Sequence, residues 1–426
     1  MAVEVTTENR SPSGEPQVHW KKNLVILWIG VFLACASYTS CIPFLPLYLL
    51  QDLQVGPDRI HFWTGAVFSV TFLGSSLMAP YWGAWADKVG QRKMAIRAGV
   101  GLSVTYAMLG VVQTPFQLFL VRGLAGIISG FVPAAMSLVS SSLPKERIGW
   151  GMGIMQTGVS SGSILGPLFG GYLSAWFGMR ASFWLGAISL FLATVMVIFQ
   201  VEEMPYIRKT RHEKLHLLRD LTGAVRNRGL LFVMAMLFLV QVCTMLVQPL
   251  VTMYVAGFTG STGEETVKLS GWIFSLAGIA GIVAAPFWGK QGQRRGFVRT
   301  LLVVLTCAGV VNLFQPAVRA LWQFAAIQFC AGLFVAGSYP NVTAILTQVT
   351  PEEMRGKAFG LITSAQQFGG VVGPLVGSGL GSFLPIRYVL FLVGLVYLLA
   401  SCYTWFMKDR LRLLTVSRKP PSGGPR

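Results

Sequence analysis

Charge is scarce in this sequence. Asp, Glu, Lys and Arg make up 12% of its 426 residues, whereas 53% are hydrophobic. Water-soluble domains carry about 25% charged residues, so the composition excludes a soluble globular chain. About twelve apolar runs of roughly 20 residues match a hydrocarbon core about 30 Å thick. We expect an all-α polytopic membrane protein with twelve transmembrane helices.

Acidic residues are scarcer still, at 16 Asp and Glu against 34 Lys and Arg. All 16 fall in expected loops, tails or span ends, so we expect no carboxylate inside the membrane. When loops are assigned to alternate sides, 28 cations fall on one side, five on the other, and Arg122 inside a span. The cation-rich side holds both termini and is expected to face the cytoplasm. This distribution fits contact with anionic lipid head groups rather than with nucleic acid.

Cysteine and histidine are few and scattered. The six cysteines lie inside apolar runs without metal-ligand spacing, and the four histidines lie in loops and the N-terminal tail. We therefore expect no metal site and no cofactor. Residues 1–17 are polar and lack the short apolar core of a secretory signal.

The apolar runs form two sets of six. We expect spans at 24–44, 62–82, 94–112, 116–141, 149–173, 182–201, 229–253, 268–288, 298–316, 321–347, 356–381 and 388–407. The predicted organisation is a cytoplasmic tail (1–22), a first six-helix half (23–201), a basic cytoplasmic linker (202–228), a second half (229–407) and a cytoplasmic tail (408–426).

The two halves repeat one another. Identical residues recur 206 positions apart, among them Pro43 and Pro249, Tyr48 and Tyr254, and Trp82 and Trp288. After one inserted residue the offset becomes 207, as for Pro167 and Pro374. Such agreement indicates a tandem duplication. In transporters built this way the substrate binds near the midplane between the halves.

A glycine-rich, basic turn joins the second and third spans. It contains Gly83, Asp87, Lys88, Gly90, Gln91, Arg92 and Lys93. The positive-inside rule explains a solvated basic turn but not this spacing. The spacing resembles the loop signature of the major facilitator superfamily. The resemblance implies a conformational latch, in which Asp87 docks near the cytoplasmic end of the eleventh span, although Asp87 could also be a simple helix cap or ion-pair partner.

Small residues recur along the fifth span. They are Gly158, Gly162, Gly166, Pro167, Gly170 and Gly171. Glycines four apart share one helix face and allow another backbone to approach closely, and a proline favours a kink. The pattern also resembles the antiporter motif of exporters in the same superfamily. The resemblance implies export rather than import.

Arg122 is the one ionisable residue that we place inside a span. A charge there costs about 2.5–3.5 kcal/mol on insertion scales, so a functional role is the first hypothesis. With Gly126 it resembles the Arg-x-x-x-Gly element of drug–proton antiporters, although Arg122 could instead snorkel to the leaflet boundary. The repeat replaces Arg122 by Gln328 and Asp87 by Gln293, so only the first half keeps these charges.

The resemblance implies a cavity built mainly from spans 1, 4, 7 and 10. Its expected non-aliphatic residues are Tyr38, Phe68, Phe72, Met155, Gln156, Gln241, Met245, Gln248, Trp272, Tyr339, Asn341, Gln366 and Gln367. Each alone could equally be a packing residue. Together they form an acid-free surface of aromatics, Met and amides, which suits neutral, zwitterionic or anionic amphiphiles.

The chain therefore resembles the bacterial multidrug efflux branch of the superfamily. We predict a monomeric exporter of small amphiphiles or drugs in the bacterial cell membrane, working by alternating access and driven by a proton gradient. Because no embedded acid is found, coupling would have to use Asp87, Asp52 or Arg122. The alternative is an exporter or flippase of a specific metabolite, sugar or lysolipid with incidental drug efflux. A further alternative is a membrane-embedded enzyme, and the only sequence feature that supports it is His61 near Asp58.

Overall fold

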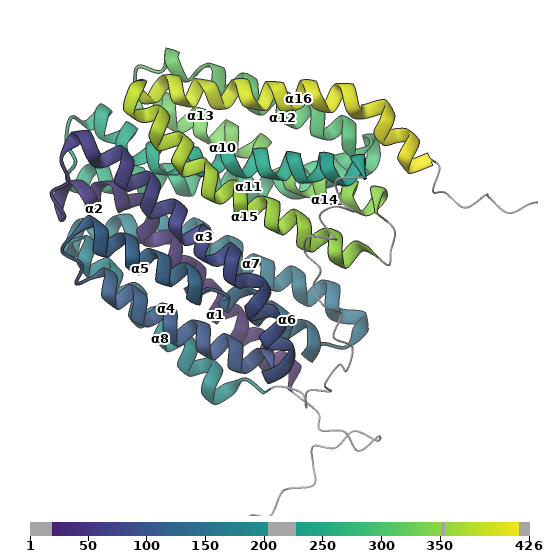
Figure 1. Cartoon of the computed structure of the whole chain (residues 1–426), viewed down its shortest axis with the longest axis horizontal. Helices are drawn as coiled ribbons and strands as arrows, with labels where there is room; N and C mark the ends of the chain where they lie inside the picture. The colour runs from purple at the N-terminus through teal and green to yellow at the C-terminus, as the bar shows by residue number, and fades with distance from the viewer. Residues whose placement is uncertain (1–18, 203–226, 351–353, 417–426) are drawn as a thin grey trace, which may run out of the picture.

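A computed structural model describes residues 19–202, 227–350 and 354–416, which are helical with short connections and contain no β-strand. Most of the expected tails and linker lie outside these ranges, so their boundaries remain predictions. Figure 1 shows two helical bundles, the first half in purple to blue and the second in green to yellow.

The first half begins with a bent span. Its elements are α1 (Trp20–Cys41), the 3-10 turn η2 (Ile42–Phe44), α2 (Leu45–Gln51), α3 (Pro57–Val89), α4 (Gln91–Leu109), α5 (Pro115–Ile128), α6 (Phe131–Ser142), η3 (Lys145–Arg147), α7 (Ile148–Phe177) and α8 (Met179–Gln200). Pro43 and Pro46 lie at the bend, where proline removes backbone donors.

The second half repeats this order. Its elements are α10 (Arg228–Thr259), α11 (Glu264–Arg295), α12 (Phe297–Leu313), η4 (Gln315–Ala317), α13 (Leu321–Val335), α14 (Ser338–Val349), α15 (Arg355–Phe383) and α16 (Ile386–Val416). Since α5 with α6 and α13 with α14 each make one crossing, the described helices form the twelve predicted spans, six in each half.

Two of those spans are broken where the sequence predicted continuous helices. The span expected at 116–141 breaks at Ser129 and Gly130, and Gly130 has φ +132°, which glycine adopts readily. The span expected at 321–347 breaks at Ala336 and Gly337. There the Trp288 ring lies so close that a Cβ on Gly337 would come within 2.7 Å of it.

Nine of the described segments are long and apolar enough to cross a membrane by composition alone. The other crossings are α4, α7 and α15. Arg92, Lys93 and Arg97 give α4 its charge, while α7 and α15 are rich in glycine. The charged residues of α4 and the glycines of α7 and α15 lower the hydropathy of these three helices.

The repeat extends to individual hydrogen bonds between the halves. Ser69 on α3 donates to the Val371 carbonyl on α15 (2.7 Å), and its repeat mate Ser275 on α11 donates to the Ile164 carbonyl on α7 (2.6 Å). The halves therefore meet through α3 against α15 and α7 against α11, in pseudo-twofold arrangement.

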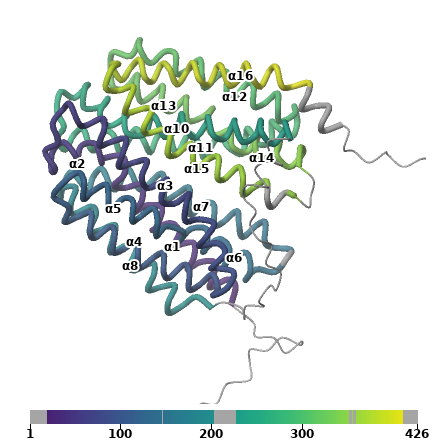
Figure 2. Tube along the Cα trace, viewed as in Figure 1, coloured from purple at the N-terminus to yellow at the C-terminus, as the bar shows by residue number. Residues whose placement is uncertain are grey.

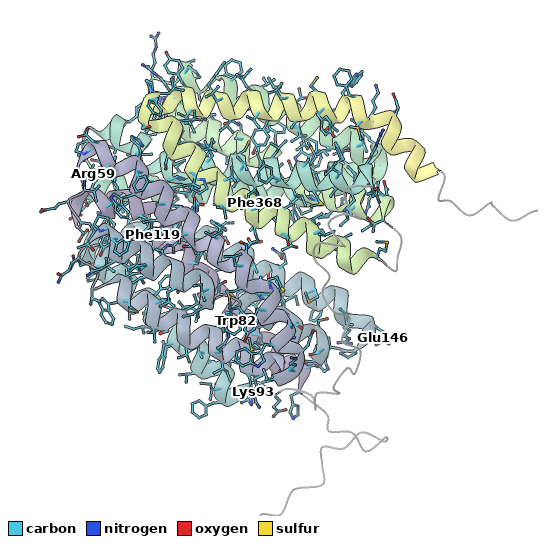
Figure 3. All side chains as sticks on the ribbon, in the orientation of Figure 1. Arg59, Trp82, Lys93, Phe119, Glu146 and Phe368 are labelled. Atoms are coloured by element: carbon cyan, nitrogen blue, oxygen red, sulfur yellow. The ribbon has the colours of Figure 1, made fainter. Side chains whose placement is uncertain are left out.

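The bundle has two chemically distinct ends. We call the end where α3 and α11 finish the basic end, since Lys88, Lys93 and Arg295 lie there, and the opposite one the far end, with Asp52 and Arg59. Figures 1 and 2 show the halves diverging toward the basic end, and Figure 3 labels Lys93 there and Arg59 at the far end.

Glycines on α7 set how closely it approaches α1. A Cβ on Gly162 would lie 2.6 Å from the Phe32 carbonyl, and Gly158, Gly166 and Gly170 likewise face α1. The glycines of α15 make the equivalent close contact with α10 in the second half. A Cβ on Gly373 would lie 2.7 Å from the Val242 carbonyl. The expected tight crossing is therefore present in both halves.

Gly162→Ala should lower the melting temperature of the purified protein, since its methyl group overlaps backbone that cannot move aside; overpacking costs about 1–3 kcal/mol. Gly153→Ala is the matched control on the same helix, because nothing lies within 4 Å of its added Cβ. Thermal melting in detergent measures both. Equal melting temperatures for the two variants would contradict this packing.

Candidate substrate cavity

The far end is closed by contacts between the halves. Thr252 on α10 donates to the Pro43 carbonyl over 2.7 Å, and Gln51 on α2 donates to the Thr262 carbonyl in the turn before α11. Trp272 on α11 donates to the Tyr172 hydroxyl over 3.1 Å. Access from the far end is therefore blocked in this conformation.

Toward the basic end the halves separate. Gln367 on α15 donates to the Ser75 hydroxyl on α3 over 3.1 Å. Beyond this pair, no hydrogen bond between the described residues joins the halves on the basic side. The conformation is thus closed at the far end and parted at the basic end.

A cavity of about 740 Å³ lies in this parted region, and we call it the large cavity. Most of its wall comes from the first half, with Thr363 and Gln367 contributed by α15. It reaches from Tyr38 and Arg122 in the interior to Gly83 and Asp87 near the basic end. Its volume fits a drug-sized molecule.

The spacing of the Arg-x-x-x-Gly element has a direct structural reason. Gly126 packs against the backbone of Thr71 on α3, leaving no room for a side chain. One turn earlier, the Arg122 carbonyl accepts a 3.1 Å hydrogen bond from the Thr71 hydroxyl. This close contact of α5 with α3 fixes the Arg122 side chain at the wall of the large cavity.

Arg122 is 2% exposed, the largest side chain buried to this degree. Its Nε and Nη2 atoms have no hydrogen-bond partner among the described residues, and its guanidinium carbon lies 6.0 Å from the Tyr38 ring centroid. Such a group is not snorkelling to a leaflet boundary, which was the alternative interpretation. It is a buried cation that faces the interior.

Arg97 is a second cation in the large cavity, and it was not among the residues predicted from the sequence. Its guanidinium carbon lies 3.6 Å from the Trp82 ring centroid, and Nη2 donates to the Ser129 carbonyl over 3.3 Å. Arg97 lies inside the expected span 94–112, but its nearness to the start of that span assigned it to the basic side. Its place inside a predicted apolar span was the signal from which a second interior cation could have been predicted.

A smaller cavity of about 250 Å³ lies within the second half. Its walls include Thr244, Asn312 and Gln328, which are the repeat mates of Tyr38, Tyr106 and Arg122 in the large cavity. The two halves thus carry equivalent cavities of different chemistry. The one in the first half is cationic and the one in the second half is neutral.

The expected cavity residues divide between these sites and the helix contacts. Tyr38 and Gln367 line the large cavity, while Met245 and Gln248 line the small one. Gln241 and Gln366 pair at 3.3 Å between α10 and α15. The remaining members, which line neither cavity, are Phe68, Phe72, Met155, Gln156, Trp272, Tyr339 and Asn341.

Three of these are buried in helix contacts, which explains why they line no cavity. Phe68, Met155 and Asn341 are at most 1% exposed. Asn341 donates to the Gly337 carbonyl over 2.7 Å and stabilises the break before α14. Sequence alone does not distinguish such packing residues from residues that face the substrate.

The expected latch residues occupy the basic end of α3 and the start of α4. Gly83 and Asp87 line the large cavity, and Gly90 ends α3 with φ 99°. Arg92 donates to the Ile198 carbonyl of α8 and so ties α4 to α8 within the first half. Asp87 is exposed and forms no ion pair with the described side chains.

The family model described as Major Facilitator Superfamily matches residues 27–267 and 261–424. The chain belongs to the major facilitator superfamily. It is therefore a multi-pass membrane transporter rather than an enzyme, and the resemblance seen in the sequence motifs is confirmed. The twelve-helix, two-half architecture is that of the family.

This major facilitator chain is similar to curated multidrug resistance proteins over nearly its whole length. It is 33% identical over 408 residues to MdtG of Salmonella arizonae, covering 95% of this chain and 100% of that protein. It is 32% identical over 404 residues to MdtG of Salmonella heidelberg, covering 95% and 99%. The predicted resemblance to the bacterial multidrug efflux branch is thereby confirmed.

Solved transporters share the fold at low sequence identity. The nucleoside transporter NupG aligns with a TM-score of 0.79 at 14% identity, covering 90% of this chain and 99% of NupG. An inward-facing bacterial homologue of the lysosomal transporter Spinster aligns with a TM-score of 0.76 at 15% identity, covering 95% and 99%. At these identities the likeness concerns the fold alone.

A cysteine pair tests which end is closed. In a cysteine-free background, Gln51→Cys with Thr262→Cys should crosslink efficiently with a short thiol reagent, because Gln51 contacts Thr262 across the halves. The crosslink should block transport, and reduction should restore it. Gel mobility and a transport assay measure the two effects.

The matched pair is Gly83→Cys with Gly360→Cys, on the basic ends of α3 and α15. An added Cβ faces open space at either position, with no atom of the other half within 4 Å. This pair should not crosslink with the same short reagent in the same conformation. Efficient crosslinking here, with none at the far end, would reverse the assignment of the closed end.

Proposed function

We propose that the protein exports small amphiphilic molecules, drugs among them, by alternating access of the large cavity to the two sides of the membrane. The observation that carries this is the 740 Å³ cavity, which is walled mainly by the first half and bordered by α15, in a conformation whose halves are parted at the basic end and closed at the far end. Its aromatic, amide and hydroxyl walls suit varied amphiphiles. The relatives named for multidrug resistance support the same activity.

The proposed orientation places the basic end in the cytoplasm of a bacterial cell, following the positive-inside rule. The conformation would then be inward-facing, ready to take substrate from the cytoplasm or inner leaflet. Each protomer contains both halves and a complete cavity, so a monomer suffices. Membrane lipids would contact the exposed apolar side chains.

Asp87 would act as the conformational latch. It is exposed at the parted basic end, where the end of α15 lies across the large cavity. When the basic end closes, Asp87 would dock against that helix end and brace the outward-facing state. Its loss would slow the conformational cycle and leave substrate affinity intact.

Proton-coupled antiport is the proposed energy source, and Asp52 is a candidate proton carrier. Its Oδ1 lies 3.4 Å from Arg180 Nε, next to Gln51 of the far-end closure. Burial raises the pKa of the Asp52 carboxyl above its ordinary value, although Arg180 opposes this shift. Asp52 therefore accepts a proton at a higher pH than an ordinary carboxyl, as a carrier facing the outside would require.

An exporter of one metabolite or lysolipid is the second candidate function. The two arginines in the wall of the large cavity, Arg97 and Arg122, favour this candidate. Two fixed positive charges would discriminate strongly between substrates with different head groups. Drug efflux would then be incidental to that transport. In liposomes, inhibition of transport by many unrelated amphiphiles would indicate drug efflux, whereas inhibition by one class of compound would indicate this second candidate.

Reconstituted liposomes test the exporter and its coupling together. A neutral fluorescent amphiphile should accumulate against its gradient when protons are offered in the opposite direction. One pH unit supplies about 1.4 kcal/mol per proton, which corresponds to about tenfold accumulation for one proton exchanged. Asp87→Asn should lower the rate at unchanged affinity, and Asp58→Asn, on the same helix but exposed at the far end, is the control.

Asp52→Asn should remove the response to the proton gradient while gradient-free exchange of substrate continues, because the neutral amide cannot carry the proton. Accumulation and exchange are measured in the same vesicles. Accumulation indifferent to pH in the wild type would exclude proton coupling and leave the exporter standing. Absence of movement of every amphiphile would exclude the proposed function.

A further inference from the structure

We propose that Arg122 recognises an anionic head group, so that the preferred substrates are amphiphiles with one acidic group and an apolar body. This inference rests on the proposed function and narrows its substrate class. It starts from the buried Arg122 guanidinium at the interior wall of the large cavity, whose Nε and Nη2 atoms have no hydrogen-bond partner among the described residues.

A buried cation without a counter-charge is unfavourable, because burial removes water that nothing replaces. Arg122 is 2% exposed and its Nε and Nη2 atoms lack partners among the described residues. Its carbonyl is held by Thr71, so the backbone cannot turn the side chain out. An incoming carboxylate, phosphate or sulfonate would satisfy these donors with the planar fork that arginine offers to such groups.

The cavity holds no acid that could serve as an internal partner at that depth. Among its described lining residues the one carboxylate is Asp87, exposed near the basic end. Tyr38 borders the guanidinium, with its ring centroid 6.0 Å from the guanidinium carbon, at the limit of a cation–π contact. Its hydroxyl group is a neutral hydrogen-bond partner of Arg122 and supplies no counter-charge. Arg97 adds a second positive charge on the same wall and has an unpartnered Nε atom of its own.

The second half supplies a comparison inside the same chain. At the equivalent depth it has Thr244, Asn312 and Gln328 in place of Tyr38, Tyr106 and Arg122. That site keeps a cavity but has no charge, so the duplicated architecture folds without the cation. The cation in the first half is therefore not required for packing, and a neutral glutamine is the replacement that this architecture already accommodates.

Matched probes test the proposal on the full chain in nanodiscs of zwitterionic lipid. They are 11-(dansylamino)undecanoate, its methyl ester and the corresponding trimethylammonium compound, which share one apolar body. Fluorescence titration, corrected with empty nanodiscs, gives their affinities. Wild type should bind the acid about 10- to 100-fold tighter than the ester, the range expected for hydrogen bonds to a charged group. The cationic probe should bind weakest.

Arg122→Gln copies the second half and should abolish the preference for the acid while ester affinity stays within about twofold. Arg122→Lys should retain part of the preference, because it keeps the charge but loses the planar fork. Arg319→Gln removes the same charge from an exposed far-end position and should change nothing. Thermal melting shows that each variant is folded.

The outcomes separate this inference from the proposed function. Equal wild-type affinity for acid and ester, with both exported from liposomes, would overturn the anion site and leave the exporter intact. An undiminished acid preference in a folded Arg122→Gln variant would also overturn it. If no probe binds and none is transported, the proposed function and the inference fall together.

Discussion

Close backbone contact at glycine is the constraint on which the rest of this structure depends. Lipid provides no hydrophobic force to pull helices together, so α7 reaches α1 and α15 reaches α10 through surfaces without side chains. Gly126 does the same for α5 against α3. Each half becomes a firm body in this way, and the position of Arg122 is a consequence of that packing.

The interface between the halves is built differently. It uses α3 against α15 and α7 against α11, with mirrored serine bonds at Ser69 and Ser275. The internal duplication therefore governs more than the helix order. It also produces two cavities at equivalent depth, and divergence of a few side chains has made one cationic and the other neutral.

Much of the fold was predictable from the sequence, because hydropathy and the offset of 206 do not depend on tertiary detail. Twelve spans, two halves and the tight glycine crossing followed from these patterns. The breaks at Gly130 and Gly337 could not be predicted in this way. The first depends on a left-handed backbone conformation and the second on the nearby Trp288 ring, and hydropathy periodicity reports neither. The prediction of Arg122 as an interior cation needed only the cost of charge in lipid.

The cavity was harder to predict, because a helix position gives depth but not direction. Phe68, Met155 and Asn341 lie on the expected helices yet face their neighbours. Arg97 was assigned to the membrane surface, because the start of a span usually lies there, although it lines the large cavity. Here the parted halves bring that level into the cavity.

The two symmetry-related hydrogen bonds donated by Ser69 and Ser275 have a mechanical consequence. Because they join the halves at equivalent positions on both sides of the pseudo-twofold axis, we expect them to act as the pivot when the halves rock. Opening the far end then requires breaking peripheral bonds such as Thr252 to Pro43 and Gln51 to Thr262. At about 0.5–1.5 kcal/mol net for each, these bonds favour the closed far end only slightly, and new contacts at the basic end can offset that preference.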